Sequence, residues 1–193
     1  MSNFCRTKIL ASIKSLNEIG LVLKKGVDII DFKDPSVGSL GALSIKQISF
    51  FLKSIPSNQL TSATIGDIKD IKIIKQKVIE LSKTSIDFIK IGFFFDEKRI
   101  KLLKDLKKLV KNKKIIAVLF ADNKPNVNLI REIKKIQFDG ILIDTKNKKN
   151  SNLRNYLSMK KLKNFIKVSK KENLSIGLAG SLNIKDIDPL IKL

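Results

Sequence analysis

Short apolar segments alternate with longer amphipathic segments along the chain, and this alternation limits the folds that the chain can adopt. The apolar segments are rich in Ile, Val and Phe, as in strands buried on both faces of a parallel sheet. These strand segments cover residues 7–13, 27–32, 60–67, 86–94, 115–121, 140–145 and 174–180. The periodicity predicts helices over 15–25, 44–55, 71–82, 96–109, 125–136 and 153–171, then a last helix that breaks near Pro189. Such strand–helix repetition predicts a parallel sheet with helices outside it.

The repetition fits a TIM (β/α)8-type barrel better than an open doubly wound sheet, which is the second choice. The Gly-x-Gly-x-x-Gly fingerprint of dinucleotide-binding folds does not follow the first strand segment. No linker or change in composition divides the chain, so we expect a single domain over residues 1–193. A complete barrel typically takes roughly 250 residues. We therefore expect a barrel that lacks the eighth strand at its C-terminal end.

The chain is strongly basic, with a net charge of +21. This charge permits nucleic-acid binding. However, nearly all of the basic residues are lysines on polar helix faces, and arginine is the usual residue for bidentate contacts to bases and phosphates. Arginine occurs only at positions 6, 99, 131 and 154. We expect a phosphorylated small molecule as the partner, because a basic surface attracts anions, and nucleic acid is disfavoured.

The cysteine content and the hydropathy of the chain indicate the cellular compartment in which the protein works. The single Cys5 excludes an internal disulfide and suits a reducing cytosol. No apolar run approaches the length of a membrane span. We expect a cytoplasmic protein without a membrane partner.

Lysines interrupt two of the strand segments near their carboxyl ends, where barrels of this type carry their active sites. Lys33 directly follows 27–32 and precedes a glycine-rich loop, and Lys90 lies within 86–94. A lone lysine at a strand end is usually a surface residue, but the same interruption in two strands indicates function. Asp144 ends the sixth strand segment, either as a catalytic group or as a cap of the next turn. Other strand ends carry Thr64, Asp67 and Asp122, and we expect Asp122 to cap a loop.

The chain contains no histidine, which narrows the chemistry of the site. Ser–His–Asp and Cys–His triads are impossible, and so is a transition-metal site built on imidazole. We expect no metal and no cofactor. Covalent catalysis then depends mainly on lysine, whose neutral amine forms a Schiff base with a carbonyl substrate. Burial and a second ammonium group both lower the pKa of a lysine, and Asp144 would stabilise the iminium or move a proton.

The last strand segment ends in a glycine-rich turn that precedes a predicted helix. Barrel phosphate sites commonly use the loops after the seventh and eighth strands together with a helix N-terminus. Gly177, Ala179, Gly180 and Ser181 are therefore the candidate phosphate-binding residues. An ordinary tight turn would give the same short motif.

The run GVDIIDFKDPSVGSLGA at 26–42 resembles the signature of the (5-formylfuran-3-yl)methyl phosphate synthase family, which acts in methanofuran biosynthesis. The runs TSATIGD at 61–67, DFIKIGFF at 87–94, DGILIDTKNKK at 139–149 and GLAGSL at 177–182 resemble the other blocks of that family, in the same order. The resemblance implies a lyase that joins two glyceraldehyde 3-phosphate molecules. The implied product is 4-(hydroxymethyl)-2-furancarboxaldehyde phosphate, formed with loss of phosphate and water.

The resemblance also implies roles for individual residues. Lys33 matches the Schiff-base lysine of the family, and Lys90 matches the lysine that accepts a proton. Asp144 and Lys148 match the aspartate and lysine that follow the sixth strand, although Lys146 and Lys149 lie close to Lys148 in the sequence.

Three alternatives stay open at this point: another Schiff-base aldolase for phosphorylated sugars, a truncated and inactive barrel, and a lysine-rich nucleic-acid binder. Members of the family continue to an eighth strand. Without that strand, the two flanking strands would expose unpaired backbone groups. We therefore expect weak phosphate binding, low activity and self-association into a homo-oligomer.

Overall fold

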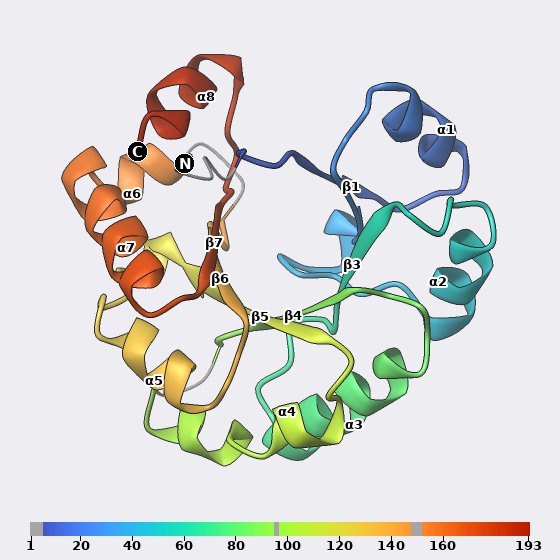
Figure 1. Cartoon of the computed structure of the whole chain (residues 1–193), viewed down its shortest axis with the longest axis horizontal. Helices are drawn as coiled ribbons and strands as arrows, with labels where there is room; N and C mark the ends of the chain where they lie inside the picture. Colours follow the sequence, from blue (N-terminus) through green and yellow to red (C-terminus); the bar gives the residue numbers. More distant parts are fainter. Residues whose placement is uncertain (1–5, 95–96, 148–151) are drawn as a thin grey trace, which may run out of the picture.

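The computed structural model describes residues 6–94, 97–147 and 152–193 (Figure 1). Its centre is a seven-stranded sheet in which each strand is hydrogen-bonded to the next along the chain, in the order β1-β2-β3-β4-β5-β6-β7. All six pairings are parallel. The sheet curls into a partial barrel, and helices cover its outside (Figure 1).

The strands lie where the apolar segments predict them, with shorter bounds at several ends. They are β1 (Leu10–Ile13), β2 (Ile29–Phe32), β3 (Leu60–Thr64), β4 (Phe88–Gly92), β5 (Lys114–Phe120), β6 (Gly140–Asp144) and β7 (Ser175–Leu178). The strictly sequential order confirms the barrel-type fold. A doubly wound sheet would instead reverse its strand order at a switch point. In the described part of the chain, β1 and β7 are the two edges of the sheet.

The helices agree less well with the predicted ranges. The α-helices are α1 (Asn17–Lys24), α2 (Ile45–Leu52), α3 (Ile71–Ser82), α4 (Leu106–Leu109), α5 (Leu129–Lys135), α6 (Leu153–Tyr156), α7 (Met159–Lys171) and α8 (Ile184–Ile191). The 3₁₀ helices are η1 (Pro35–Val37), η2 (Glu97–Leu103) and η3 (Ala121–Asn123). In the described residues no helix is long and apolar enough to cross a membrane.

The prediction of one α-helix over 96–109 is wrong, because η2 and the short α4 occupy this region. The side chains of Ile100, Leu103 and Leu106 are all buried at a spacing of three residues. A 3₁₀ helix has three residues per turn, so Ile100 and Leu103 lie on one face of η2, and Leu106 begins α4 three residues later. The sequence pattern fits both periods over so short a stretch.

Three other helix predictions need correction. The helix predicted over 125–136 is shorter, since only α5 is helical there. The helix predicted over 153–171 is interrupted at Leu157, and Ser158 begins α7 by accepting a hydrogen bond from the Lys161 N–H. Pro189 does not break α8. Proline leaves the carbonyl of Lys185 without its helical partner, but Lys185 is exposed, so water can satisfy that carbonyl.

The strands divide their side chains between two faces. The outward face packs against the helices and forms the main core, with Ile30, Phe32, Ala63, Ile89, Ile91, Ile115, Ala117, Leu119, Ile141 and Ile143 all buried. Alternation along each strand turns the intervening residues into the barrel. On β2, β3 and β4 these inward residues are polar, namely Asp31, Ser62, Thr64 and Lys90. A fold that buries so many polar groups on one side of its interior has a reason other than stability.

Lysines also form hydrogen bonds and an ion pair at the amino-terminal ends of the strands, on the side of the barrel opposite their carboxyl ends. Lys113 Nζ donates hydrogen bonds of 2.7 Å to the carbonyls of Thr84 and Ile86. Lys107 Nζ lies 2.7 Å from Asp139 Oδ2 and 2.6 Å from the Lys113 carbonyl oxygen. These contacts join the segment before β4 to the start of β5 without involving the carboxyl ends of the strands.

We expect Lys113→Met to lower the free energy of unfolding by about 1–3 kcal/mol, because two half-buried carbonyls lose a charged donor. Urea denaturation followed by circular dichroism measures the change. Lys111→Met is the matched control, since Lys111 is exposed in the same turn. Equal midpoints for the two variants would contradict the assigned role of Lys113.

Candidate active site

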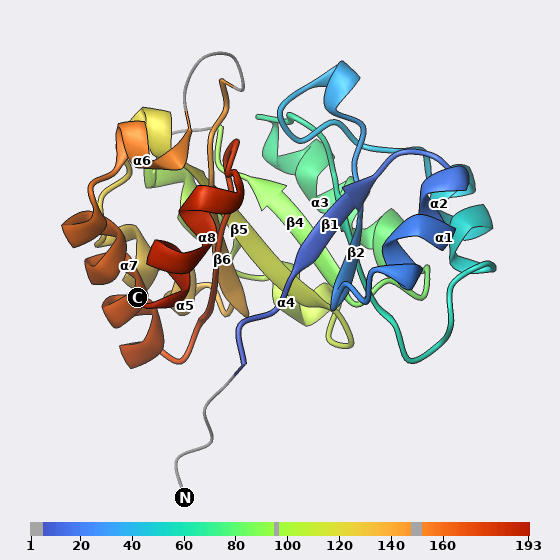
Figure 2. The same cartoon turned by 90° about the horizontal axis from the view of Figure 1, so that it is seen from above.

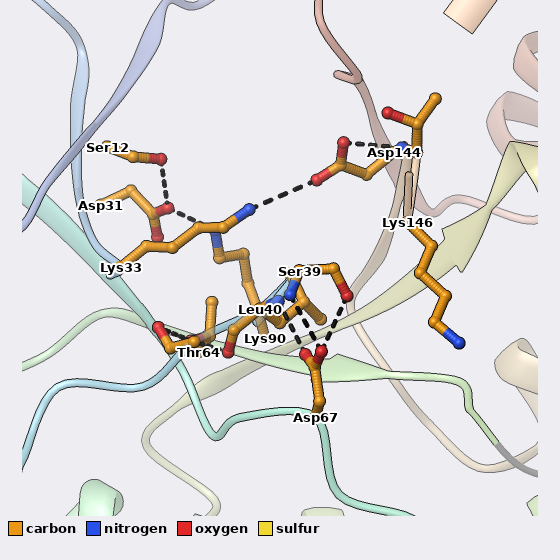
Figure 3. Close-up of polar contacts among 12 residues, drawn as sticks. Ser12, Asp31, Lys33, Ser39, Leu40, Thr64, Asp67, Lys90, Asp144 and Lys146 are labelled. Carbon is orange, nitrogen blue, oxygen red and sulfur yellow. Dashed lines mark hydrogen bonds and ion pairs between the residues drawn. The ribbon is translucent and has the colours of Figure 1, made fainter. Parts of the chain in front are cut away.

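The carboxyl ends of all the strands point to the same side of the molecule, which also carries the loop after β2 (Figure 2). Asp31 lies in β2, and Lys33 is the first residue after that strand. The two side chains share the inward face because they are two residues apart. Lys90 in β4 and Asp144 at the end of β6 also point inward, so the four groups meet inside the barrel (Figure 3). Their side chains are between 0 and 11% exposed.

Lys90 and Asp31 form a buried ion pair with 2.6 Å between Lys90 Nζ and Asp31 Oδ2. The Ser12 hydroxyl of β1 donates to Asp31 Oδ2 at 2.8 Å, and the Ser62 hydroxyl of β3 donates to Asp31 Oδ1 at 2.6 Å. Asp31 thus accepts from side chains on three other strands, β1, β3 and β4. A charged carboxylate that is removed from water requires hydrogen bonds and an ion pair of this kind.

Burial lowers the pKa of Lys90, because the ammonium form loses its hydration inside the barrel. The Asp31 carboxylate opposes this effect, whereas the neighbouring Lys33 adds to it. The net effect is a pKa below the ordinary value of a lysine, because burial is the largest of these influences. Lys90 therefore gives up its proton more readily than a lysine in water.

Lys33 reaches across the barrel to the opposite wall. Its Nζ lies 3.6 Å from Asp144 Oδ2 (Figure 3). The other oxygen, Asp144 Oδ1, accepts a 2.7 Å hydrogen bond from the Thr145 N–H. The carboxylate is therefore held in one orientation while the lysine amine approaches it from β2. An amine and a carboxylate in this arrangement can exchange a proton through a small shift or one water molecule.

Thr64, the last residue of β3, and Asp67, which follows that strand, hold the glycine-rich loop after Lys33 in place. The Thr64 hydroxyl donates to the Leu40 carbonyl at 2.8 Å. Asp67 accepts hydrogen bonds from the Ser39 N–H at 2.9 Å, the Ser39 hydroxyl at 2.9 Å and the Leu40 N–H at 2.7 Å. These two residues order the wall of the site.

Asp122 fixes the loop after β6 in a similar way. It accepts hydrogen bonds from the Lys146 N–H at 3.1 Å and the Asn147 N–H at 2.9 Å. Lys146 Nζ lies 5.9 Å from the centre of the Phe94 ring at the mouth of the barrel. Asp122 thus caps a loop, as expected from the sequence. Lys148, the fourth predicted catalytic residue, lies outside the described residues.

The end of β7 and the turn after it contain the four predicted phosphate-binding residues. Gly177 lies in β7, and the Ala179 N–H is already engaged in the sheet by donating to the Ile143 carbonyl at 2.7 Å. Gly180 has φ +111° and packs so closely on Thr145 that a Cβ would lie 2.7 Å from its methyl group. Ser181 has φ +50°. These contacts explain the shape of the turn, and its phosphate role stays a prediction.

The amino end of α8, which follows this turn, is capped by the chain itself. Asn183 accepts a hydrogen bond from the Lys185 N–H, and the buried Asp186 accepts one from the Asn183 N–H at 3.0 Å. Asp186 also pairs with Arg154 at 3.2 Å. A carboxylate at this position takes up part of the positive potential that a phosphate would otherwise use.

The sequence analysis did not select Asp31, Ser12 or Ser62 as site residues. Asp31 carried a signal, because it stands two residues before Lys33 in an apolar strand and therefore shares its face. Ser12 and Ser62 carried none, because a serine in a strand is common and its partner depends on the strand register. That register aligns Ser12 with Asp31 and Asp31 with Ser62.

Parallel strands in sequential order, outer helices and a lysine–carboxylate cluster at the strand ends define a (β/α)-barrel protein with a polar interior. Solved structures share this fold. CutC from Streptococcus agalactiae has a TM-score of 0.77 at 12% identity, covering 96% of this chain and 94% of that one. QR15, described as an aldolase, has a TM-score of 0.64 at 12% identity, covering 96% of this chain and 85% of that one.

The sequence comparison is more specific than the fold. The family model of 4-HFC-P synthase matches residues 9–193, and the chain therefore belongs to the 4-HFC-P synthase family. A (5-formylfuran-3-yl)methyl phosphate synthase from Methanococcus aeolicus is 30% identical over 96% of this chain and 84% of its own length. The protein of that name from Methanococcus maripaludis strain C7 is 29% identical over 95% and 83%. The resemblance inferred from the sequence blocks is confirmed.

Proposed function

We propose that this chain is a (5-formylfuran-3-yl)methyl phosphate synthase that works through a lysine imine. The observation that carries the proposal is the pair of buried lysines at the strand ends, each facing its own carboxylate: Lys33 with Asp144 and Lys90 with Asp31. The proposed reaction is the one that the sequence resemblance implies, in which two glyceraldehyde 3-phosphate molecules give the furan aldehyde phosphate with loss of phosphate and water. On this proposal the chain is a lyase of methanofuran biosynthesis, and we place it in the cytoplasm.

In the first step the neutral amine of Lys33 attacks the aldehyde carbon of one substrate molecule. The resulting carbinolamine loses water and becomes an imine, whose nitrogen is protonated to an iminium ion. Asp144, at 3.6 Å from Lys33 Nζ, is placed to donate and accept the protons of this dehydration. The iminium withdraws electrons from the adjacent carbon and makes its C–H bond acidic.

In the second step Lys90 accepts that proton. Its lowered pKa provides a neutral amine inside the barrel, and the Asp31 carboxylate stabilises the ammonium that forms. The resulting enamine carbon can then attack the aldehyde of a second substrate molecule. On this proposal Lys33 binds the substrate covalently and Lys90 accepts the proton.

We assign binding of a substrate phosphate to the end of β7 and the turn after it, at Gly177, Ala179, Gly180 and Ser181. Gly180 and Ser181 are the stronger candidates, because the Ala179 N–H is engaged with Ile143. Lys148 belongs to the proposal only through its match to the family. Self-association and weak phosphate binding also stay predictions, which light scattering and phosphate titration can test.

Incubation with glyceraldehyde 3-phosphate tests the proposal, because a conjugated furan aldehyde absorbs in the ultraviolet and the substrate does not. We expect furan absorbance and released phosphate to rise together. A borohydride-trapped imine without any furan would favour another Schiff-base aldolase for phosphorylated sugars. Absence of both the furan and the imine from folded protein would contradict the proposal.

A further inference from the structure

Leu40 is a loop residue whose side chain lies wholly inside the barrel. It is 0% exposed, although it belongs to the glycine-rich loop that follows Lys33. It packs with Val118 and Phe120 of β5, and the partly buried Phe94 and Leu142 complete this inner cluster. The rings of Phe94 and Phe120 lie 4.5 Å apart. This inner cluster is separate from the core that lies between the sheet and the helices.

The inner cluster borders both lysine–carboxylate pairs. A Cβ added to Gly92 would lie 2.7 Å from Leu40 Cδ1, and Gly92 follows Lys90 by two residues on the same face of β4. On the other side, Phe120 pairs in register with Asp144. Leu40 and its neighbours therefore form an apolar wall next to the strand positions of Lys90 and Asp144.

The position of Leu40 is fixed by contacts on both of its backbone groups. Asp67 accepts from its N–H at 2.7 Å, and the Thr64 hydroxyl donates to its carbonyl at 2.8 Å. The loop is closed at its base by the Asp34 N–H, which donates to the Gly41 carbonyl at 2.9 Å. Because its backbone is held in this way, Leu40 cannot move readily to make room for a longer ligand.

We propose that Leu40 determines substrate length, by filling the space that a fourth carbon of a phosphorylated aldose would occupy. The inference rests on the proposed function, because it assumes that an aldose forms an imine inside the barrel. An apolar side chain suits this role, since it limits space without offering a hydrogen bond to the hydroxyl groups of a longer sugar.

Competitive trapping measures this selectivity. The protein is incubated with equal concentrations of glyceraldehyde 3-phosphate and erythrose 4-phosphate in the presence of cyanoborohydride. The amine and aldehyde lose water to form the imine, hydride from the reagent reduces it, and intact mass separates the three-carbon from the four-carbon adduct. Because the ratio is compared between variants, the solution equilibria of the sugars cancel.

We expect Leu40→Ala to raise the ratio of four-carbon to three-carbon adduct by roughly tenfold, as for removal of a steric limit in a pocket. Leu40→Met conserves volume and should stay within about twofold of the unmodified chain. Val37→Ala is the matched control, because Val37 is 64% exposed in the same loop. Leu40→Val, which is less disruptive, should give an intermediate ratio if Leu40→Ala does not fold.

The outcomes distinguish this inference from the proposed function. A trapped three-carbon adduct on the unmodified chain, with the same ratio in folded Leu40→Ala or Leu40→Val, would overturn the role of Leu40 alone. No adduct with either sugar on the unmodified chain would overturn the imine, and the role of Leu40 with it. A ratio that rises equally in Val37→Ala would show general loosening of the loop and would also overturn the inference.

Discussion

Lys33→Arg is expected to abolish both furan formation and the borohydride-trapped adduct. Guanidinium remains protonated at any usable pH and cannot form an imine, although it can still pair with Asp144. Removal of the nucleophile in covalent catalysis costs on the order of 10⁴–10⁶-fold in turnover. Furan absorbance gives the rate, and peptide mapping of the reduced adduct gives its position.

The substitution keeps the charge and most of the volume, so the barrel should fold normally by circular dichroism. Lys111→Arg is the control, since it makes the same change at an exposed position. Peptide mapping that places the adduct on another lysine in an active preparation would refute the assignment. So would turnover by Lys33→Arg close to that of the control.

The parallel sheet could be predicted from the sequence because its signal is repeated and local. Each strand is a short apolar run, and each run ends in glycine, proline or a charged residue. Lys33 and Lys90 stood out because lysines interrupt two apolar segments in the same way, which a surface lysine at a single strand end does not explain. Their position at one end of the barrel then followed from strand direction alone, without knowledge of any contact.

The rest depended on contacts between segments distant in the sequence. Asp31 became a partner of Lys90 only through the register that aligns β2 with β3 and β3 with β4. No local pattern in the glycine-rich loop predicts the burial of Leu40, whose backbone is held by hydrogen bonds from Thr64 and to Asp67. The 3₁₀ helix η2 was missed because its spacing of three also fits one turn of an α-helix.

The ion pair between Lys90 and Asp31 should matter separately for stability and for catalysis. Asp31→Ala is expected to lower the free energy of unfolding by about 3–5 kcal/mol, because a wholly buried ammonium loses its counter-charge. Lys90→Met should lower kcat on the order of 10²–10⁴-fold, the usual contribution of a general base. Urea denaturation and furan absorbance measure the two effects.

The double variant Asp31→Asn with Lys90→Met separates the effect on stability from the effect on kcat. It removes both charges and leaves an amide whose oxygen accepts from one of the two serine hydroxyls and whose NH2 group donates to the other. Most of the stability lost in Asp31→Ala should therefore return, since paired buried charges contribute little net stability. The kcat should stay low, because no amine is present. Recovery of kcat together with stability would mean that Lys90 is structural only.

The pH dependence of Asp31→Asn provides a more specific test of the proton transfer. Lys90 must be neutral to accept a proton, so kcat should fall as the pH falls through the pKa of Lys90. The Asp31 carboxylate raises that pKa against the larger effect of burial. Its replacement by a neutral amide removes the opposing influence, lowers the pKa of Lys90 further, and should move the acid limb of the kcat profile to lower pH. A limb that stays in place, or moves to higher pH, would show that another group accepts the proton, because the 2.6 Å contact with Asp31 makes the pKa of Lys90 respond to this substitution.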